Sequence, residues 1–465
     1  MKQSMNYQEF VSKKLTRSPA TGLVEVPELS AHLFPFQRDL VRWALKRGRA
    51  AIFAATGLGK TRMELEWARH VSAHTKRPVL ILAPLAVAQQ TVAEGARMGM
   101  DVTLCRSGDD VSDGVNVANY ERLHKFDCGL FGGVVLDESS IIKHHDAKTL
   151  GLMMAAFGHT AFKLCATATP APNDYTELGT HAEFLGVCTR AEMLSEFFCH
   201  DGGETQVWRI KGHARQAFWR FVSTWGALLR NPSDLGYEDG GYKLPPLNVE
   251  QHIIPADVST VRAAGLLFAE EASTLSERRD ARRATIAARV RECAALVNSD
   301  LQPWIVWCDL NAESDALREA IPDALEVRGS DDLDDKEQKL RAFSTGNARV
   351  LITKPSIAGF GLNWQHCARV AFVGVTDSWE AYFQAVRRCW RFGQTRPVNV
   401  HVFASELEGE VVRNLQRKEA DAERMSRELS AETGDALRIE VLGQQRQTRE
   451  YNPTTAIELP RWLAA

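Results

Sequence analysis

The strongest chemical signal in the sequence is a glycine-rich segment at residues 54–61, with the sequence AATGLGKT. It follows an apolar run and precedes a helical pattern, so its N–H groups can turn toward an anion at a helix N-terminus. In such a loop the lysine reaches the β- and γ-phosphates of a nucleotide, and the hydroxyl after it binds Mg²⁺. The alternative is an ordinary strand-to-helix turn that happens to contain Gly-Lys-Thr. The residues predicted to bind ATP here are Thr56, Gly57, Leu58, Gly59, Lys60 and Thr61, with Thr61 also on the metal.

Two adjacent carboxylates follow a second apolar run, in the sequence VVLDE at residues 134–138. A buried strand with this pattern releases both side chains at the carboxyl edge of a parallel sheet, beside the phosphate loop. Asp137 is predicted to hold Mg²⁺, and Glu138 to orient and deprotonate an attacking water. An apolar run that ends in Asp-Glu is weak evidence alone, but after a phosphate loop it indicates ATP hydrolysis. ATP and Mg²⁺ are therefore the expected cofactors.

A third group lies far along the chain, where Gln384, Arg388 and Arg391 follow one another at i, i+4 and i+7. On a helix this spacing places them on one face. The guanidinium groups of Arg388 and Arg391, presented across a cleft, could offset the charge that builds on a transferring γ-phosphate. The spacing alone does not establish this role, and all three residues are predicted to be catalytic because of the resemblance to a known motif described below. The alternative is a solvated basic helix or a face of ion pairs.

The elements that must position these groups form two series of short apolar runs, separated by loops or helical patterns. This alternation indicates parallel sheets covered by helices, and hence two α/β units in tandem with a helical protrusion between them. The first series is residues 51–54, 79–83, 102–105, 115–118, 134–136 and 163–166. The second series is residues 304–308, 325–327, 350–353, 370–375 and 398–403.

The segments between and after the two units differ in composition. Residues 195–250 are rich in aromatic side chains and end in a Gly/Pro-rich stretch that reads as a linker. Residues 259–298 are free of proline and helical in pattern. The predicted domains are lobe 1 at 1–190, a helical and aromatic insertion with linker at 191–250, a helical segment at 251–298, lobe 2 at 299–405 and a C-terminal helical extension at 406–465.

Composition excludes several classes of protein. The chain has 465 residues, with 56 Lys and Arg against 59 Asp and Glu, and the net charge of −3 excludes a globally basic nucleic-acid coat. The longest apolar stretch, residues 79–88, is too short to cross a bilayer. The first ten residues lack the apolar core of a secretory signal, and nine cysteines without a CxxC pair indicate a reducing compartment. We therefore expect a cytoplasmic protein without a membrane partner.

Several segments together resemble motifs of one enzyme family. They are LFPFQ at 33–37, DESSIIK at 137–143, TATP at 167–170, AGFGLN at 358–363 and the Gln384 to Gln394 segment. In this order they resemble the Swi/Snf-type ATPases of helicase superfamily two, and the minimal phage or bacterial members more than the large chromatin remodellers. The resemblance implies two RecA-like lobes, with Gln37 reading the adenine edge and Gly361 near the nucleotide. This sequence departs from the family pattern at Ser140, where a histidine is usual, and at Ala168, where a glycine is usual.

The same resemblance implies DNA as the partner, double-stranded by preference and forked DNA as a further substrate. The implied function is an ATP-dependent DNA translocase. A partner protein could recruit it to DNA, and the sequence does not identify that protein. A strand-separating or branch-migrating helicase and a nucleotide-switched DNA-binding module remain alternatives, and RNA stays open as a substrate. The residues at family positions that face nucleic acid are Pro84, Asn119, Tyr120, Lys143 and Thr353.

Three further clusters have two interpretations each. Trp208, Trp219 and Trp225 could stack bases, but packing in the core of the protrusion is the better account. Arginines 278, 279, 282 and 283 form either a DNA-facing patch or a solvated helix face. A zinc site is not predicted at the remaining cluster, because its spacing lacks paired CxxC or HxxxH elements. That cluster is Cys188, Cys199, His200 and His213.

Overall fold

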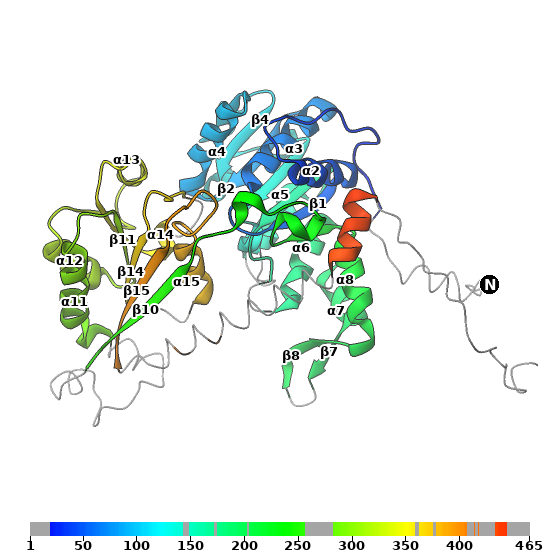
Figure 1. Cartoon of the computed structure of the whole chain (residues 1–465). Coiled ribbons are helices and arrows are strands. Elements are labelled where there is room, and N and C mark those ends of the chain that lie inside the picture. Colours follow the sequence, from blue (N-terminus) through cyan, green and yellow to red (C-terminus); the bar gives the residue numbers. More distant parts are fainter. Residues whose placement is uncertain are drawn as a thin grey trace, which may run out of the picture.

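Two parallel-sheet α/β domains make up the described part of the chain, as a computed structural model shows (Figure 1). They correspond to the tandem RecA-like lobes expected from the sequence, and the predicted fold class is confirmed. We call them lobe 1 and lobe 2. The structure describes residues 19–142, 148–171, 174–201, 204–255, 282–358, 362–374, 378–406, 413, 417 and 433–443.

Lobe 1 is built on a parallel sheet with the strand order β3-β4-β2-β5-β6-β1-β9. Its strands are β1 (Arg49–Ala54), β2 (Val79–Ala83), β3 (Val102–Leu104), β4 (Val115–Asn119), β5 (Gly133–Asp137), β6 (Phe162–Thr167) and β9 (Gly226–Leu229). The central strands are buried along their length, because helices cover both faces of the sheet. Each apolar run of the first predicted series is a strand here.

The sheet of lobe 1 separates two apolar cores, one on each of its faces, and helices pack over them. The helices are α2 (Pro35–Arg47), α3 (Lys60–Thr75), α4 (Leu85–Arg97), α5 (Lys148–Phe157) and α6 (Leu178–Leu185). Helix α2 has proline at its first turn and ends at Gly48, whose φ of 76° suits glycine. A helix over residues 433–442 returns to this lobe, where Leu437 is fully buried in the core of α2 and α3.

The protrusion from lobe 1 contains α7 (Arg190–Phe197), β7 (Phe198–Asp201), β8 (Glu204–Ile210) and α8 (Arg215–Ser223). Strands β7 and β8 form an antiparallel hairpin at its far end (Figure 1). Trp219 and Trp225 are 1% and 0% exposed and pack in the core, as predicted, while Trp208 is half-buried against His200.

Residues 191–250 supply more sheet than the sequence analysis predicts. Besides the hairpin, β9 pairs with β1 in the sheet of lobe 1, and the start of β10 (Leu247–Ile254) pairs with β15 in lobe 2. Strand β10 is an edge strand whose residues are mostly exposed, so it lacks the apolar run by which the other strands are recognised.

Lobe 2 has the strand order β10-β15-β14-β11-β13-β12, again parallel throughout. The strands after β10 are β11 (Trp304–Cys308), β12 (Ala324–Glu326), β13 (Val350–Thr353), β14 (Arg369–Val373) and β15 (Val398–Ser405). The helices are α11 (Ile286–Asn298), α12 (Asn311–Ala320), α13 (Leu333–Ser344), α14 (Pro355–Ala358) and α15 (Trp379–Val386). No helix in the described ranges of either lobe is both long and apolar enough to cross a membrane.

A buried ion pair joins α11 to α12 and gives a test of the packing in lobe 2. Arg289 Nη1 lies 2.8 Å from Glu313 Oε1, and both side chains are 0% exposed. Replacing Glu313 with glutamine keeps the shape but leaves a buried guanidinium without its counter-charge, so we expect a loss of about 3–5 kcal/mol in the free energy of unfolding. Urea unfolding followed by circular dichroism measures this loss.

The matched control is Glu292→Gln, which removes an exposed partner of Arg291 at 3.5 Å on the same helix. The side chains of that pair are 73% and 52% exposed, so solvent screens them and the loss should stay below about 1 kcal/mol. Equal losses in the two variants would contradict the assignment of the buried pair as a specific stabilising contact.

Candidate active site

The glycine-rich segment forms a tight turn between β1 and α3. Gly57 and Gly59 have φ values of 96° and 79°, a left-handed region that favours glycine, and Gly59 is the N-cap of α3. Lys60 and Thr61 are the first residues of that helix and are half-buried. Lys60 Nζ donates to the carbonyl oxygen of Ala54 at 3.0 Å. The turn therefore has the backbone geometry and the cation that a phosphate requires.

Gln37 links helix α2 to this turn. Its side chain is 1% exposed, its Oε1 accepts from the Phe34 N–H at 2.9 Å, and its Nε2 donates to the Leu58 carbonyl at 2.7 Å. A Cβ atom added at Gly59 would lie 2.3 Å from that Nε2. Gln37 thus positions the loop in this structure, and contact with adenine stays a prediction.

The acidic motif lies at the carboxyl end of β5. Asp137 is 5% exposed, and Glu138 has a φ of 51°, a strained conformation for a residue with a side chain. Two hydrogen bonds hold the backbone of this motif and a third holds the Glu138 side chain. The Glu138 N–H donates to Asp137 Oδ1 at 2.9 Å, the Tyr120 hydroxyl to the Asp137 carbonyl at 2.7 Å, and the Thr167 hydroxyl to Glu138 Oε2 at 3.3 Å. Such strain, of order 1–3 kcal/mol, is typical of functional sites.

A third carboxylate, Glu64, joins this cluster and was not predicted. It is 0% exposed on α3, and its carboxylate lies beside that of Asp137. Burial and the nearby charge of Asp137 raise the pKa of Glu64 well above its usual value. Its place one helical turn after Lys60, on the same face of α3, is the signal that could have identified it.

The electrostatics of this cluster reflect crowded carboxylates around one cation. Burial and the charge of Glu138 raise the pKa of Asp137 to about 7. Burial lowers the pKa of Lys60, although Glu138 and Asp137 oppose this effect. A divalent cation would relieve the repulsion among the carboxylates, because its charge favours their ionised forms.

The arginines of lobe 2 lie just after α15. Arg388 is 2% exposed and donates from Nε and Nη2 to the carbonyl and Oε1 of Gln384, each at 2.9 Å. Arg391 Nη1 donates to the Leu362 carbonyl at 3.2 Å. The buried Nε of Arg391 and Nε2 of Gln384 have no hydrogen-bond partner within the described ranges. Such unpaired donors indicate a place where an anion would bind.

The prediction that these three residues share one helical face is wrong. Helix α15 ends at Val386, so of the three only Gln384 lies on it, and Arg388 and Arg391 lie in the turns that follow. Arg388 and Gln384 still meet, because the Arg388 guanidinium donates to Gln384 Oε1. Gly393, in the turn after Arg391, has a φ of 91°.

The two lobes meet at this cluster. Burial lowers the pKa of Arg388, although the charges of Glu138 and Asp137 oppose this effect, and the charge of Arg391 adds to the lowering of the Lys60 pKa by burial. A Cβ atom added at Gly57 would lie 2.9 Å from the backbone nitrogen of Phe392. The Phe392 ring also packs on Tyr242, with 4.6 Å between centroids. Residues predicted separately in the two lobes therefore share one site.

The residues present fit a nucleotide with a divalent cation. Lys60 and the glycine turn offer positive groups for phosphates, Asp137 and Thr61 offer hard oxygen ligands, and the charge of Arg391 from lobe 2 acts on Lys60. Glu138 is half-buried beside them and bonded to Thr167. Gly361, also predicted at the nucleotide, lies outside the described residues.

Of the predicted DNA contacts that the structure describes, two are buried. Pro84 follows β2 and Asn119 is the last residue of the adjacent strand β4, but Asn119 is 7% exposed and its side chain caps the next turn. The Tyr120 hydroxyl bonds to the acidic motif, and Thr353 is fully buried with its hydroxyl on the Val327 carbonyl. Lys143 lies outside the described residues. A DNA contact at these positions stays a prediction.

The structure also places Ser140, which departs from the family pattern, and Arg282 of the arginine cluster. Ser140 is 6% exposed, and the neighbouring Ser139 hydroxyl lies 3.1 Å from His181 Nε2, which connects the acidic motif to α6. Arg282 is 6% exposed and pairs with Asp309 at 2.7 Å, which argues against a DNA-facing role for it. Arginines 278 and 279 lie outside the described residues.

Comparison with known proteins gives two matches. Residues 293–393 match the helicase conserved C-terminal domain family, a range that includes Gln384, Arg388 and Arg391. The chain is also 27% identical over 176 residues to protein p41 of Acyrthosiphon pisum secondary endosymbiont phage 1, a match that covers 32% of this chain and 38% of that protein. The domain match indicates a superfamily-two, helicase-like protein and supports a nucleic-acid-dependent ATPase.

Proposed function

We propose that this protein is an ATP-dependent DNA translocase of the Swi/Snf-like type, which couples ATP hydrolysis to movement on double-stranded DNA. The observation that carries the proposal is the meeting of Lys60, Asp137 and Glu138 from lobe 1 with Arg388 and Arg391 from lobe 2. Neither lobe alone holds all the groups that phosphoryl transfer to water requires.

Each residue has a distinct task in this proposal. Lys60 and the loop N–H groups bind the β- and γ-phosphates, while Thr61 and Asp137 hold Mg²⁺, which supplies charge stabilisation at the phosphate oxygens. Glu138 orients the attacking water and accepts its proton, and its bond from Thr167 fixes the carboxylate. Arg388 and Arg391 offset negative charge on the γ-phosphate.

This division of the site between two lobes explains how hydrolysis would produce movement. ATP attracts the guanidinium groups of lobe 2 toward lobe 1, and loss of the γ-phosphate removes that attraction. ATP therefore favours a closed arrangement and hydrolysis an open one, which is a hinge motion driven by differential affinity. If each lobe binds the phosphate backbone of DNA, alternate closing and opening moves one grip relative to the other.

The test is the rate of ATP hydrolysis by the full chain with single-stranded, double-stranded and forked DNA and with RNA, at several salt concentrations. We expect the largest stimulation with double-stranded DNA, falling as salt rises because phosphate contacts release counterions. Hydrolysis that no nucleic acid stimulates would overturn the proposal, and stimulation by RNA alone would replace its substrate.

A second candidate, strand separation at a fork, is favoured by the hairpin of β7 and β8. The hairpin extends away from the sheet of lobe 1, where it could divide two strands (Figure 1). Triplex displacement and fork unwinding, measured side by side, distinguish the two activities. Displacement without unwinding supports the translocase, and unwinding without displacement supports the helicase.

The contact between the phosphate loop and lobe 2 gives a further prediction. Gly57→Ala adds a methyl group only 2.9 Å from the Phe392 backbone, so the two lobes cannot approach as they do here. Because small misplacements of reacting groups are costly, we expect DNA-stimulated hydrolysis to fall on the order of 10²-fold. Steady-state phosphate release measures this fall.

Gly99→Ala is the matched control, since Gly99 also has a left-handed φ, of 70°, but has nothing within 4 Å of an added Cβ. Both variants carry a backbone penalty of about 1–2 kcal/mol, whereas only Gly57→Ala disturbs the cleft. Equal rates in the two variants would show that the contact with Phe392 does not matter for hydrolysis.

A further inference from the structure

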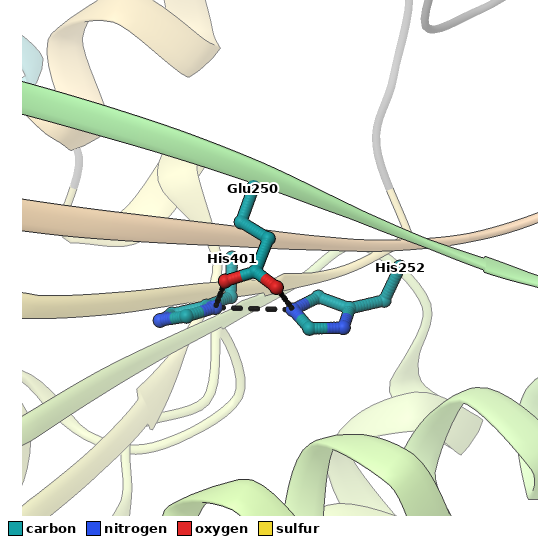
Figure 2. A group of neighbouring side chains, drawn as sticks. All are labelled: Glu250, His252 and His401. Atoms are coloured by element: carbon teal, nitrogen blue, oxygen red, sulfur yellow. Dashed lines mark hydrogen bonds and ion pairs between the residues drawn. The ribbon is translucent and has the colours of Figure 1, made fainter.

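Three possible metal ligands converge on lobe 2, on the edge of its sheet. Glu250 and His252 alternate on β10 and therefore point to the same face, and His401 of β15 is the parallel partner of Glu250. Figure 2 shows the carboxylate of Glu250 above the two imidazole rings, with one nitrogen of each ring directed at the other. The sequence gives no hint of this group, because His401 is far from the other two.

The distances suit a small divalent ion. His252 Nε2 lies 3.0 Å from His401 Nδ1, and the Glu250 oxygens lie 3.4 Å from His401 Nδ1 and 4.0 Å from His252 Nε2. A tetrahedral zinc ion with bonds of about 2.0–2.2 Å holds its ligand atoms about 3.4 Å apart. Small side-chain shifts would bring all three atoms into a coordination shell.

The surroundings fix the rings and leave one side open. The His252 ring stacks on Phe403, with centroids 4.5 Å apart and an interplanar angle of 10°. The His401 side chain is 10% exposed and packs beside Trp304, whereas the Glu250 side chain is 65% exposed. Three protein ligands on two paired strands, with solvent at the fourth position, would complete a tetrahedral site.

The chemistry of the donors favours an imidazole-binding metal. Burial and the neighbouring His252 hold the pKa of His401 below its usual value, which favours the neutral ring that a metal requires. Two ring nitrogens and one carboxylate suit Zn²⁺, whereas Mg²⁺ and Ca²⁺ prefer oxygen ligands. The alternative is a hydrogen-bonded histidine pair beside a surface glutamate.

We propose that Glu250, His252 and His401 bind one Zn²⁺ ion, separate from the nucleotide cleft and independent of the proposed translocase activity. Because β10 is the edge strand and directly follows the segment that connects the two lobes, the ion would fasten this connection to β15. Metal binding there stabilises lobe 2, since only the folded sheet brings the ligands together.

Zinc binding to the full chain, after removal of metals with a chelator, tests the site directly. Competition with a chromophoric chelator should show one bound equivalent and a higher melting temperature with Zn²⁺. Glu250→Gln and His252→Gln should each weaken binding beyond the 10–100-fold typical of losing an outer-shell partner, and should abolish the rise in melting temperature. Circular dichroism of the metal-free variants confirms that they fold.

The controls are His124→Gln, which removes an exposed histidine from lobe 1, and Gln251→Ala, which alters the opposite face of β10. Both should bind Zn²⁺ as the unaltered chain does. The proposal is overturned if the unaltered chain binds no Zn²⁺, or if Glu250→Gln and His252→Gln bind it with unchanged affinity. Neither result depends on ATP hydrolysis.

Discussion

Lys60→Ala is expected to abolish ATP turnover, with a fall of at least 10²–10³-fold, the scale of removing one preorganised group that stabilises developing charge. Lys60 lies at the start of α3 with the carboxylates of Glu64, Asp137 and Glu138 acting on it. Without its charge the carboxylates face the nucleotide phosphates with less compensation, so nucleotide affinity should fall together with the rate. Phosphate release and binding of a fluorescent ATP analogue measure the two effects.

Lys46→Ala is the control for this substitution, because Lys46 is an exposed lysine in the last turn of the neighbouring helix α2. It removes the same charge from the same lobe without touching the cleft, and its turnover should match that of the unaltered chain. Near-normal turnover in Lys60→Ala would mean that the glycine-rich turn does not bind the phosphates, and the site assignment would fail.

The sheets could be predicted from the sequence because their strands are buried on both faces. Such strands appear as continuous apolar runs, and every predicted run matches a strand of lobe 1 or lobe 2 within about two residues at each end. Strand β10 is not a continuous apolar run, because four consecutive residues among its eight are exposed. Strand β9 was hidden in the aromatic segment, where pairing with β1 depends on contacts remote in sequence.

The functional residues also fall into two groups, those that a local sequence pattern reveals and those that depend on contacts remote in sequence. Lys60, Asp137 and Glu138 belong to short local motifs, so sequence alone brings them to notice. Glu64 and the inward orientation of Thr353 depend on packing against other elements, which no local pattern records. The spacing of Gln384, Arg388 and Arg391 predicted a single helical face, but α15 ends at Val386 and both arginines lie after it.

Arg391→Ala is expected to retain ATP binding but lose hydrolysis by about 10³-fold or more, the effect of removing an arginine that stabilises the charge on a transferring phosphate. Arg391 comes from lobe 2, so the phosphate loop and Lys60 of lobe 1 still bind the nucleotide. Burial and the charge of Arg388 hold the pKa of Arg391 below its usual value, which means that the two guanidiniums repel each other. Removing one should therefore leave the nucleotide-free chain no less stable.

This combination of results separates a catalytic arginine from a structural one. A purely structural role would lower the melting temperature together with the rate. For Arg388→Ala we expect both to fall, because Arg388 is proposed to act on the γ-phosphate and is also buried and bonded to Gln384 and Leu362. Arg341→Ala on α13 removes an exposed arginine of the same lobe and should change neither quantity. If Arg391→Ala hydrolyses ATP at a near-normal rate, lobe 2 does not complete the site, and a motor that works by closing two lobes loses its physical basis.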